Sequence, residues 1–312
     1  MTSASSSTAP QLEIERKFRV TPPVYAKIQE LCVRRGNPAV DENCTNNTIS
    51  IRDVYYDFPP SSTSASEPPG EDNAKENQYP LLRNDHWLRK RNGSWELKKP
   101  SKRMAETDDT QKNLREGEES SRRTQEYIEL QGEAEIEMAI RRLVTSSNAK
   151  ASSLLSSATP FADLETKRES WTVKGQGDVH IDIDRVRFRW PPGGEQDEAA
   201  DSGESLESED FAFVIGEIEC IVSAPDSSTP QVEQGIKKEV LESQRAKIKA
   251  VEEAFLSLTV TENEENNTST SQKCSDDDRE IQGGKLLVYL RRFQPKLLQI
   301  LLDGATAKKR KT

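Results

Sequence analysis

An alternation of charged and apolar residues constrains the fold of this chain more than any other feature, and residues 12–18 show it best, with Arg16 as the one polar residue on the apolar side. Read as a β-strand, the run L-E-I-E-R-K-F places Glu13, Glu15 and Lys17 on one sheet face and the aliphatic and aromatic residues on the other, because successive side chains point to opposite sides of a sheet. Two carboxylates and an ammonium group on one face suit a polar cavity, where carboxylates hold a hard divalent cation and lysine holds an anion. A half-solvated edge strand is the alternative interpretation of this stretch taken alone.

Further runs along the chain have strand-like patterns, at residues 48–58, 86–91, 94–98, 127–130, 164–173, 179–188 and 211–222. The second and third of these runs are joined by Asn92-Gly93, which is the strongest short signal for a β-hairpin. Helical spacing is predicted for residues 22–32, 134–144, 231–258 and 295–302, and the last ordered stretch is predicted to begin at residues 285–289.

The strands supply charged residues of both signs at alternating positions. The acidic set is Glu13, Glu15, Asp182, Asp184, Glu217 and Glu219, and the basic set is Lys17, Arg89, Arg91, Lys98, Arg168 and Lys285. For any one pair a solvated sheet face is an equal alternative, but burying charges of one sign alone would be prohibitive. A closed antiparallel barrel resolves this, with both signs inside and the apolar faces outward under helices. An oligophosphate with Mg²⁺ would be a ligand that complements the charges inside such a barrel.

Composition predicts one compact domain interrupted by polar segments. Hydrophobic residues make up 33% of the chain and charged residues 31%, which is a polar composition for a globular protein. The polar residues are concentrated in a few low-complexity stretches. The predicted organisation is a disordered tail at residues 1–10, a single domain at 11–302 with insertions near 59–80, 101–123, 191–210 and 260–284, and a basic tail at 303–312.

Charge and residue usage exclude several classes of protein. A formal net charge of -10 argues against nonspecific nucleic-acid binding, and the chain has neither an apolar run of membrane-spanning length nor an apolar signal core near its start. Its four scattered cysteines read as reduced thiols, and two histidines exclude a histidine-rich metal site. We expect a cytoplasmic monomer without membrane or nucleic-acid partners; residues 308–311 are either a solvated basic terminus or a nuclear address.

The sequence resembles the CYTH superfamily of triphosphate tunnel enzymes, and within it the thiamine triphosphatases. The motifs that carry the resemblance run in order from Leu12 to about Leu302: E-x-E-x-K at 13–17, RDVYYD at 52–57, HWLRKR at 86–91, WELK at 95–98, TKR at 166–168, IDID at 181–184, GEIE at 216–219 and KLLVY at 285–289. The low-complexity insertions fall between these motifs. The resemblance implies an α+β fold in which an eight-stranded antiparallel β-barrel forms a tunnel with helices around it. It also implies metal-dependent hydrolysis of thiamine triphosphate to thiamine diphosphate and phosphate, with Mg²⁺ as the expected ion and Mn²⁺ as an alternative.

The same resemblance implies roles for individual residues. The metal ligands would be Glu13, Glu15, Asp182, Glu217 and Glu219, and the catalytic centre would include Glu13, Glu15 and Lys17. The phosphates would be bound by Lys17, Arg89, Arg91, Lys98, Arg168 and Lys285. Trp87 would stack on the thiamine rings, because an aromatic face suits a cationic thiazolium, or would be an ordinary core tryptophan. Tyr55 would contact phosphate or serve in packing, and Asp184 has no definite role.

Three alternative functions are compatible with these residues. The tunnel could hydrolyse inorganic tripolyphosphate or a nucleoside triphosphate, it could be an adenylate cyclase of the same superfamily, or it could bind a polyphosphate without turnover. The HWLRKR and WELK motifs favour thiamine triphosphate. The full acidic set argues against a binder, because phosphate binding alone does not need so many metal ligands.

Overall fold

The computed structural model describes residues 11–35, 48–58, 79–101, 124–144, 153–189, 213–223, 238–256 and 284–302. Both predicted tails and nearly all of the four predicted insertions lie outside the described residues; the exceptions are residues 79–80, 101 and 284 at their edges. The predicted domain organisation therefore stays a prediction.

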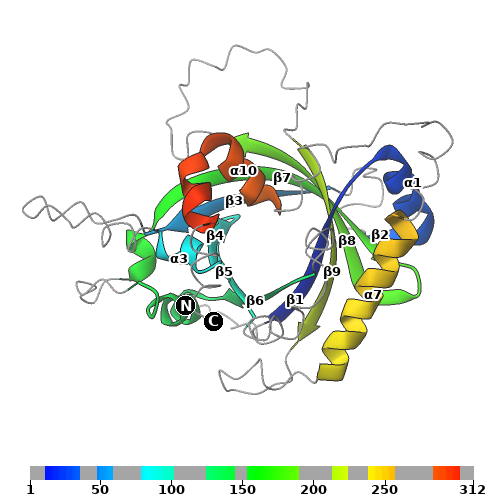
Figure 1. Ribbon diagram of the computed structural model, residues 1–312, viewed down its shortest axis with the longest axis horizontal. Helices are drawn as coiled ribbons and strands as arrows, with labels where there is room; N and C mark the ends of the chain where they lie inside the picture. The colour runs from blue at the N-terminus through cyan, green and yellow to red at the C-terminus, as the bar shows by residue number, and fades with distance from the viewer. Residues whose placement is uncertain are drawn as a thin grey trace, which may run out of the picture.

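The described residues form one antiparallel sheet of nine strands, eight of which close into a barrel (Figure 1). The strands are β1 (Gln11–Arg19), β2 (Cys32–Arg34), β3 (Thr48–Asp57), β4 (Trp87–Arg91), β5 (Ser94–Pro100), β6 (Gln125–Gln131), β7 (Thr159–Val173), β8 (Gln176–Arg189) and β9 (Phe213–Ser223). Around the barrel their order is β7-β3-β4-β5-β6-β1-β9-β8, and β8 pairs back onto β7. The extra strand β2 pairs with the end of β7. The predicted eight-stranded antiparallel barrel is confirmed.

The predicted hairpin between β4 and β5 is present at its predicted turn. Asn92 and Gly93 have φ angles of 48° and 90°, the left-handed conformation that these two residue types adopt at little cost. The turn sets Arg89 opposite Glu96 and Trp87 opposite Lys98. These side chains therefore share one face of the sheet.

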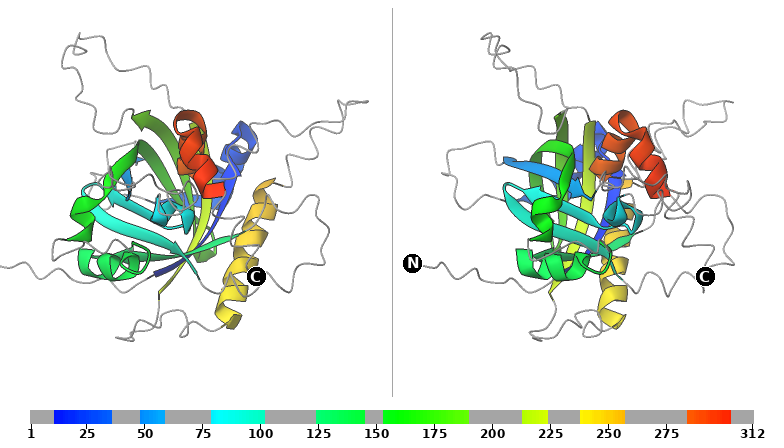
Figure 2. Two further views of the ribbon diagram at one scale, coloured as in Figure 1. Left: turned by 60° about the vertical axis from the view of Figure 1, so that its left-hand side comes forward. Right: turned by 90° about the vertical axis from the view of Figure 1, so that its left-hand side faces the viewer.

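Helices lie around the barrel, and several of them pack against its outer, apolar face. The helices are α1 (Pro22–Leu31), α3 (Pro80–Arg83), α5 (Glu133–Ile140), α7 (Lys238–Leu256) and α10 (Gly284–Phe293), with a 3-10 turn at Leu154–Ser157 and a further helix at residues 295–302. In Figures 1 and 2, α7 lies along the outside of the barrel beside β1 and β9, and α1 lies next to it. Ile14, Ile28 and Ile248 are fully buried between these elements, and burial of each such side chain contributes about 1.5–3 kcal/mol.

A buried ion pair also fastens α7 to the barrel wall. Glu126 on β6 has an outward-facing carboxylate that is 1% exposed and pairs with Arg245 of α7. Because register sets Ile14 of β1 opposite Glu126, this pair lies on the outer side of the sheet, away from the barrel interior.

The helix α10 closes one end of the barrel. At that end the inward-facing positions are apolar, and they pack against α10 and the helix at residues 295–302 in one buried cluster that includes Leu164, Val186, Ile215, Leu286, Tyr289, Leu290 and Leu297. We expected a strand to supply Lys285, and this was wrong: Lys285 is the second residue of α10. A short apolar run of this kind does not distinguish a buried strand from a buried helix. Of the helices in the described residues, none is both long and apolar enough to cross a membrane.

Candidate active site

A cavity of about 380 Å³ occupies the barrel interior, and most of the predicted site residues line it. The lining residues from the predicted sets are Glu13, Glu15, Lys17, Tyr55, Trp87, Arg89, Arg91, Lys98, Arg168, Glu217, Glu219 and Lys285. They come from β1, β3, β4, β5, β7, β9 and α10. Asp182 and Asp184 pair with Arg168 at the cavity wall instead. The fold thus brings together charges that lie up to about 270 residues apart in the chain.

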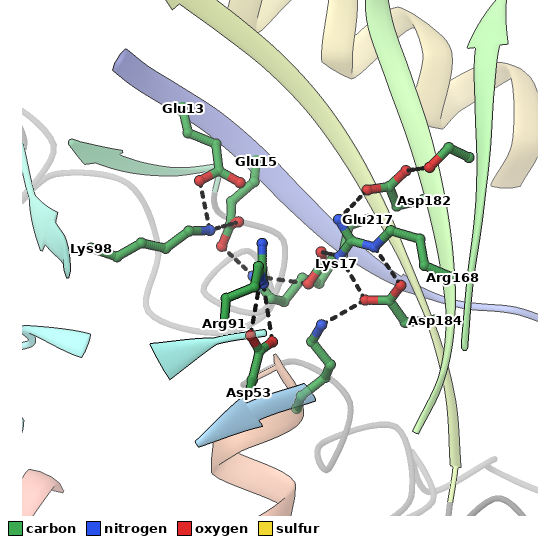
Figure 3. Close-up of polar contacts among 12 residues, drawn as sticks. Glu13, Glu15, Lys17, Asp53, Arg91, Lys98, Arg168, Asp182, Asp184 and Glu217 are labelled. Carbon is green, nitrogen blue, oxygen red and sulfur yellow. Dashed lines mark hydrogen bonds and ion pairs between the residues drawn. The ribbon is translucent and has the colours of Figure 1, made fainter. Parts of the chain in front are cut away.

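On β1 the two glutamates are held by two lysines (Figure 3). Glu15 pairs with Lys17 and accepts a hydrogen bond from Lys98 Nζ at 3.1 Å. Lys98 Nζ also lies 2.6 Å from Glu13 Oε2. All four side chains are largely removed from water, so these contacts act in a medium of low dielectric constant. Lys98 links β5 to the acidic face of β1.

Arg168 is the centre of a second charged cluster on β7, β8 and β9. Its Nε and Nη2 donate to the two carboxylate oxygens of Asp184, each at 2.7 Å, and its Nη2 also donates to Glu217 at 3.1 Å. It pairs with Asp182 as well. Lys285 Nζ reaches the same Asp184 carboxylate at 2.7 Å. Both oxygens of Asp184 are therefore occupied by cations, which assigns Asp184 to holding Arg168 and Lys285 in place.

The two arginines of β4 have carboxylate partners that sequence reasoning missed. Arg89 donates to Glu96 at 2.8 Å and to Glu129 at 3.2 Å. Arg91 donates to both oxygens of Asp53, at 2.8 and 3.0 Å. Alternation along β3 and β6 places Asp53 and Glu129 on the inward face, and that signal could have identified them. Each falls in a run with several acidic or aromatic neighbours, so the pattern alone did not separate them from solvated residues.

The cavity also has an apolar region. The half-buried Trp87 lies on the same wall as Arg89 and Arg91, and Tyr127, Ile221, Leu287 and Leu301 line the cavity as well. Tyr55 is 6% exposed, lines the cavity and also packs against Phe161 with ring centroids 6.4 Å apart. Its position is compatible with both of its predicted roles.

At the N-terminus of α10 the backbone approaches the site closely. Gly284 has a φ of 74°, and a Cβ atom there would lie 2.6 Å from Lys17 Cε. A side chain at this position would strain the backbone and displace Lys17. Glycine thus lets the start of α10 lie against Lys17, directly before Lys285.

Burial and neighbouring lysines shift the pKa values of the carboxyls in opposite directions. Burial raises the pKa of Glu219 to about 8, and Asp182 and Glu13 add to the shift by repulsion. Burial also raises the pKa of Glu13 to about 7 despite the nearby Lys98. For Glu15, burial acts in the same sense, but Lys17 and Lys98 outweigh it and hold the pKa of the carboxyl well below its usual value. Of these three carboxyls, Glu15 is the one whose pKa is lowered.

The chemistry of this donor set fits a hard divalent cation. Several buried carboxyls lie near one another, and burial together with repulsion from neighbouring carboxylates raises the pKa of Glu13 and Glu219. Among the residues that the structure describes, however, no three acidic, histidine or cysteine side chains converge as a metal-holding group. Lys98 and Arg168 occupy the oxygens instead. Carboxylates that could hold a cation are present, but in the described residues they are paired with lysine and arginine.

Taken together, this is a closed barrel whose interior places ammonium and guanidinium groups against carboxylates, a cavity suited to a multiply charged anion together with a cation. The model of the CYTH domain family matches residues 11–249, about three quarters of the sequence. The chain belongs to the CYTH domain family.

Curated relatives and solved structures are similar to the chain over most of its length. Proteins named thiamine-triphosphatase from Macaca fascicularis and Homo sapiens are each 23% identical over 305 residues, which is 96% of this chain and 93% of each relative. Among solved structures, the PH1819 protein from Pyrococcus Horikoshii OT3 has a TM-score of 0.29 and 16% identity, covering 74% of this chain and 89% of its own. A candidate adenylyl cyclase from Hippeastrum, described as having a dominant triphosphatase activity, has a TM-score of 0.28 and 12% identity, covering 75% and 87%.

Proposed function

We propose that this protein hydrolyses thiamine triphosphate to thiamine diphosphate and phosphate with the help of a divalent metal ion, Mg²⁺. The observation that carries the proposal is the cavity itself, in which six cations and a cluster of carboxylates lie next to the half-buried Trp87. The two relatives named thiamine-triphosphatase support the choice of substrate.

The phosphates would lie among the basic side chains, and the organic group would lie against the apolar region. Arginine forks and lysine point charges suit phosphoryl oxygens, which is the role proposed for Lys17, Arg89, Arg91, Lys98, Arg168 and Lys285. Trp87 would offer its ring face to the cationic thiazolium. Both parts of the substrate would then be held at once, which fixes the terminal phosphoryl group near β1.

The metal ion would be held by carboxylates of β1, β8 and β9, namely Glu13, Glu15, Asp182, Glu217 and Glu219. When bound, such an ion neutralises phosphoryl charge and lowers the pKa of a coordinated water. We infer that the anionic substrate draws Lys98 and Arg168 toward its phosphates and thereby releases the carboxylates to which these two residues are now paired.

In the proposed reaction a water molecule attacks the terminal phosphorus in line with the bridging oxygen. A bond from the water oxygen to phosphorus forms, the bond to the bridging oxygen breaks, and thiamine diphosphate leaves with that oxygen, while the oxygen and protons of the water remain with the released inorganic phosphate. Glu15, which Lys17 holds ionised after Lys98 has turned to the phosphates, would accept a hydrogen bond from the water and orient it. Cys32 and Cys220 are buried in an apolar cluster and do not line the cavity, so the proposed reaction does not use their thiols.

Phosphate release with Mg²⁺ from thiamine triphosphate, tripolyphosphate and ATP, measured side by side, tests the proposal. We expect a strong preference in kcat/KM for thiamine triphosphate. A preference for tripolyphosphate or ATP would keep the hydrolase and overturn the substrate. No release from any of the three would overturn the proposed function.

The occupied carboxylates lead to a prediction about metal binding. Mg²⁺ alone should raise the melting temperature only slightly, because Lys98 and Arg168 already neutralise its ligands. Mg²⁺ with a methylene-bridged, non-hydrolysable triphosphate should raise it by more than the sum of the two separate effects. Differential scanning fluorimetry measures this, with Mg²⁺ plus sulfate as the control. A full shift with Mg²⁺ alone would show that the ligand set is already free.

A further inference from the structure

The carboxylate of Asp53 lies beneath the guanidinium group of Arg91 and is fully buried. Register sets the two residues directly opposite each other on β3 and β4. Arg91 Nε donates to Asp53 Oδ1 at 2.8 Å, and Arg91 Nη2 donates to Asp53 Oδ2 at 3.0 Å. Asp53 has no exposed surface, whereas the Arg91 side chain is 22% exposed. The pair is therefore oriented, with the carboxylate on the protein side and the arginine on the cavity side.

This two-point contact determines which edge of Arg91 remains for a ligand. Asp53 occupies Nε and one hydrogen of Nη2, so the Nη1 edge of the planar fork is left directed away from Asp53. Figure 3 shows Asp53 on one side of the guanidinium and the Glu13, Glu15 and Lys98 group on the other. A second hydrogen bond prevents rotation of the fork about a single contact.

Asp53 also lies among other cations of the site. Its Oδ1 is 3.9 Å from Arg89 Nε, and Lys285 lies near enough to act on its charge. Arg91 meanwhile faces repulsion from Arg89 and Arg168. One fully buried carboxylate thus offsets repulsion among basic side chains that come from β4 and α10.

We propose that Asp53 is a positioning residue that holds Arg91 by its Nε–Nη2 edge so that the Nη1 edge contacts the substrate's phosphates. The inference rests on the proposed function and adds a residue to which no role in the reaction has been given. It acts through Arg91 and does not touch the substrate.

The chain contains a matched control for this pair. Asp163 on β7 is 3% exposed and forms the same two-point contact with Arg52 of β3, at 3.1 and 2.6 Å, on the outer side of the barrel wall. Asp163→Asn and Asp53→Asn therefore remove equivalent carboxylate–arginine pairs from opposite sides of the barrel wall. Only the second pair includes a cavity residue.

The experiment compares kcat/KM for thiamine triphosphate and tripolyphosphate in the full chain and the two variants. We expect Asp53→Asn to lower kcat/KM about tenfold to hundredfold for both substrates, because a displaced phosphate ligand costs on that scale, and Asp163→Asn to stay within about twofold of the wild type. In an Arg91→Ala background, Asp53→Asn should add little further loss, because the two residues act as a unit.

The outcomes separate this inference from the proposed function. If the wild type is active, three results would overturn the positioning role alone. These are an unchanged kcat/KM in Asp53→Asn, an equal loss of kcat/KM in Asp163→Asn, and a loss from Asp53→Asn that adds in full to the loss from Arg91→Ala. A wild type that hydrolyses no triphosphate overturns the proposed function and the inference with it. If Asp53→Asn does not fold, the Arg91→Lys variant tests the inference instead. Lysine keeps the positive charge but lacks the planar guanidinium group, so an unchanged kcat/KM in this variant would overturn the role of the guanidinium group.

Discussion

Glu15→Gln should lower kcat on thiamine triphosphate by about a hundredfold to a thousandfold while the protein stays folded. Glutamine keeps the shape of the side chain but removes the one carboxylate of the β1 pair whose pKa is held well below its usual value, where burial is outweighed by Lys17 and Lys98. Both lysines keep a second partner, since Lys17 Nζ lies 3.7 Å from Glu217 and Lys98 Nζ lies 2.6 Å from Glu13. Steady-state kinetics and far-UV circular dichroism measure the two effects.

Glu126→Gln is the matched control for this variant. It removes a buried carboxylate from the neighbouring strand β6, but on the outer side of the barrel, where Glu126 pairs with Arg245 of α7. We expect this variant to lose stability and to keep kcat. Near-normal metal-dependent turnover in Glu15→Gln, or equal losses of kcat in both variants, would refute the role assigned to Glu15.

Arg168→Ala should have the largest effect on stability. The variant leaves Asp182, Asp184 and Glu217 buried with one cation fewer, and breaking a buried ion pair from one side typically costs roughly 3–5 kcal/mol. It should also abolish most turnover, because Arg168 is a proposed phosphate ligand. Urea unfolding followed by circular dichroism measures the loss, and Arg168→Lys, which keeps the charge, should lose less.

The stability deficit of Arg168→Ala should depend on pH with a definite sign. In the wild type, burial alone would raise the pKa of Asp184, but Arg168 and Lys285 outweigh burial and lower it. A carboxyl with a lowered folded-state pKa stabilises the fold above its unfolded pKa, and this stabilisation is lost as pH falls through the folded value. Without Arg168 that pKa rises, so the deficit of the variant should be full at neutral pH and should shrink as pH falls through the variant's pKa toward the lower folded-state pKa of the wild type. A deficit independent of pH would indicate lost packing rather than uncompensated charge.

Alternation in the sequence was sufficient to predict which side chains face inward. Along β1, the period of two separates Glu13, Glu15 and Lys17 from the apolar face, and local backbone geometry alone imposes that period. The β4–β5 hairpin was equally predictable, because Asn92-Gly93 encodes its own turn. The barrel followed because charges of both signs recurred on the inward faces, and such faces can be buried only against one another.

Which charges meet was decided by tertiary structure. Lys17 lies opposite Glu217, 200 residues away, and Arg91 lies opposite Asp53. These pairings depend on register between strands, which no local pattern encodes. Asp53 was part of a motif that carried the family resemblance, yet only its position under Arg91 indicates what it does.

Lys285 shows most plainly the difference between what a local sequence pattern predicts and what the tertiary structure decides. The sequence placed a lysine before an apolar run, and such a run suits a buried strand and a buried helix equally. In the fold it belongs to α10, where the positive φ of Gly284 and the apolar end of the barrel bring its ammonium group to Asp184 at 2.7 Å. Residue types and sheet faces are local properties that the sequence alone determined, whereas the pairing of buried charges depends on contacts between distant segments and exists only in the folded barrel.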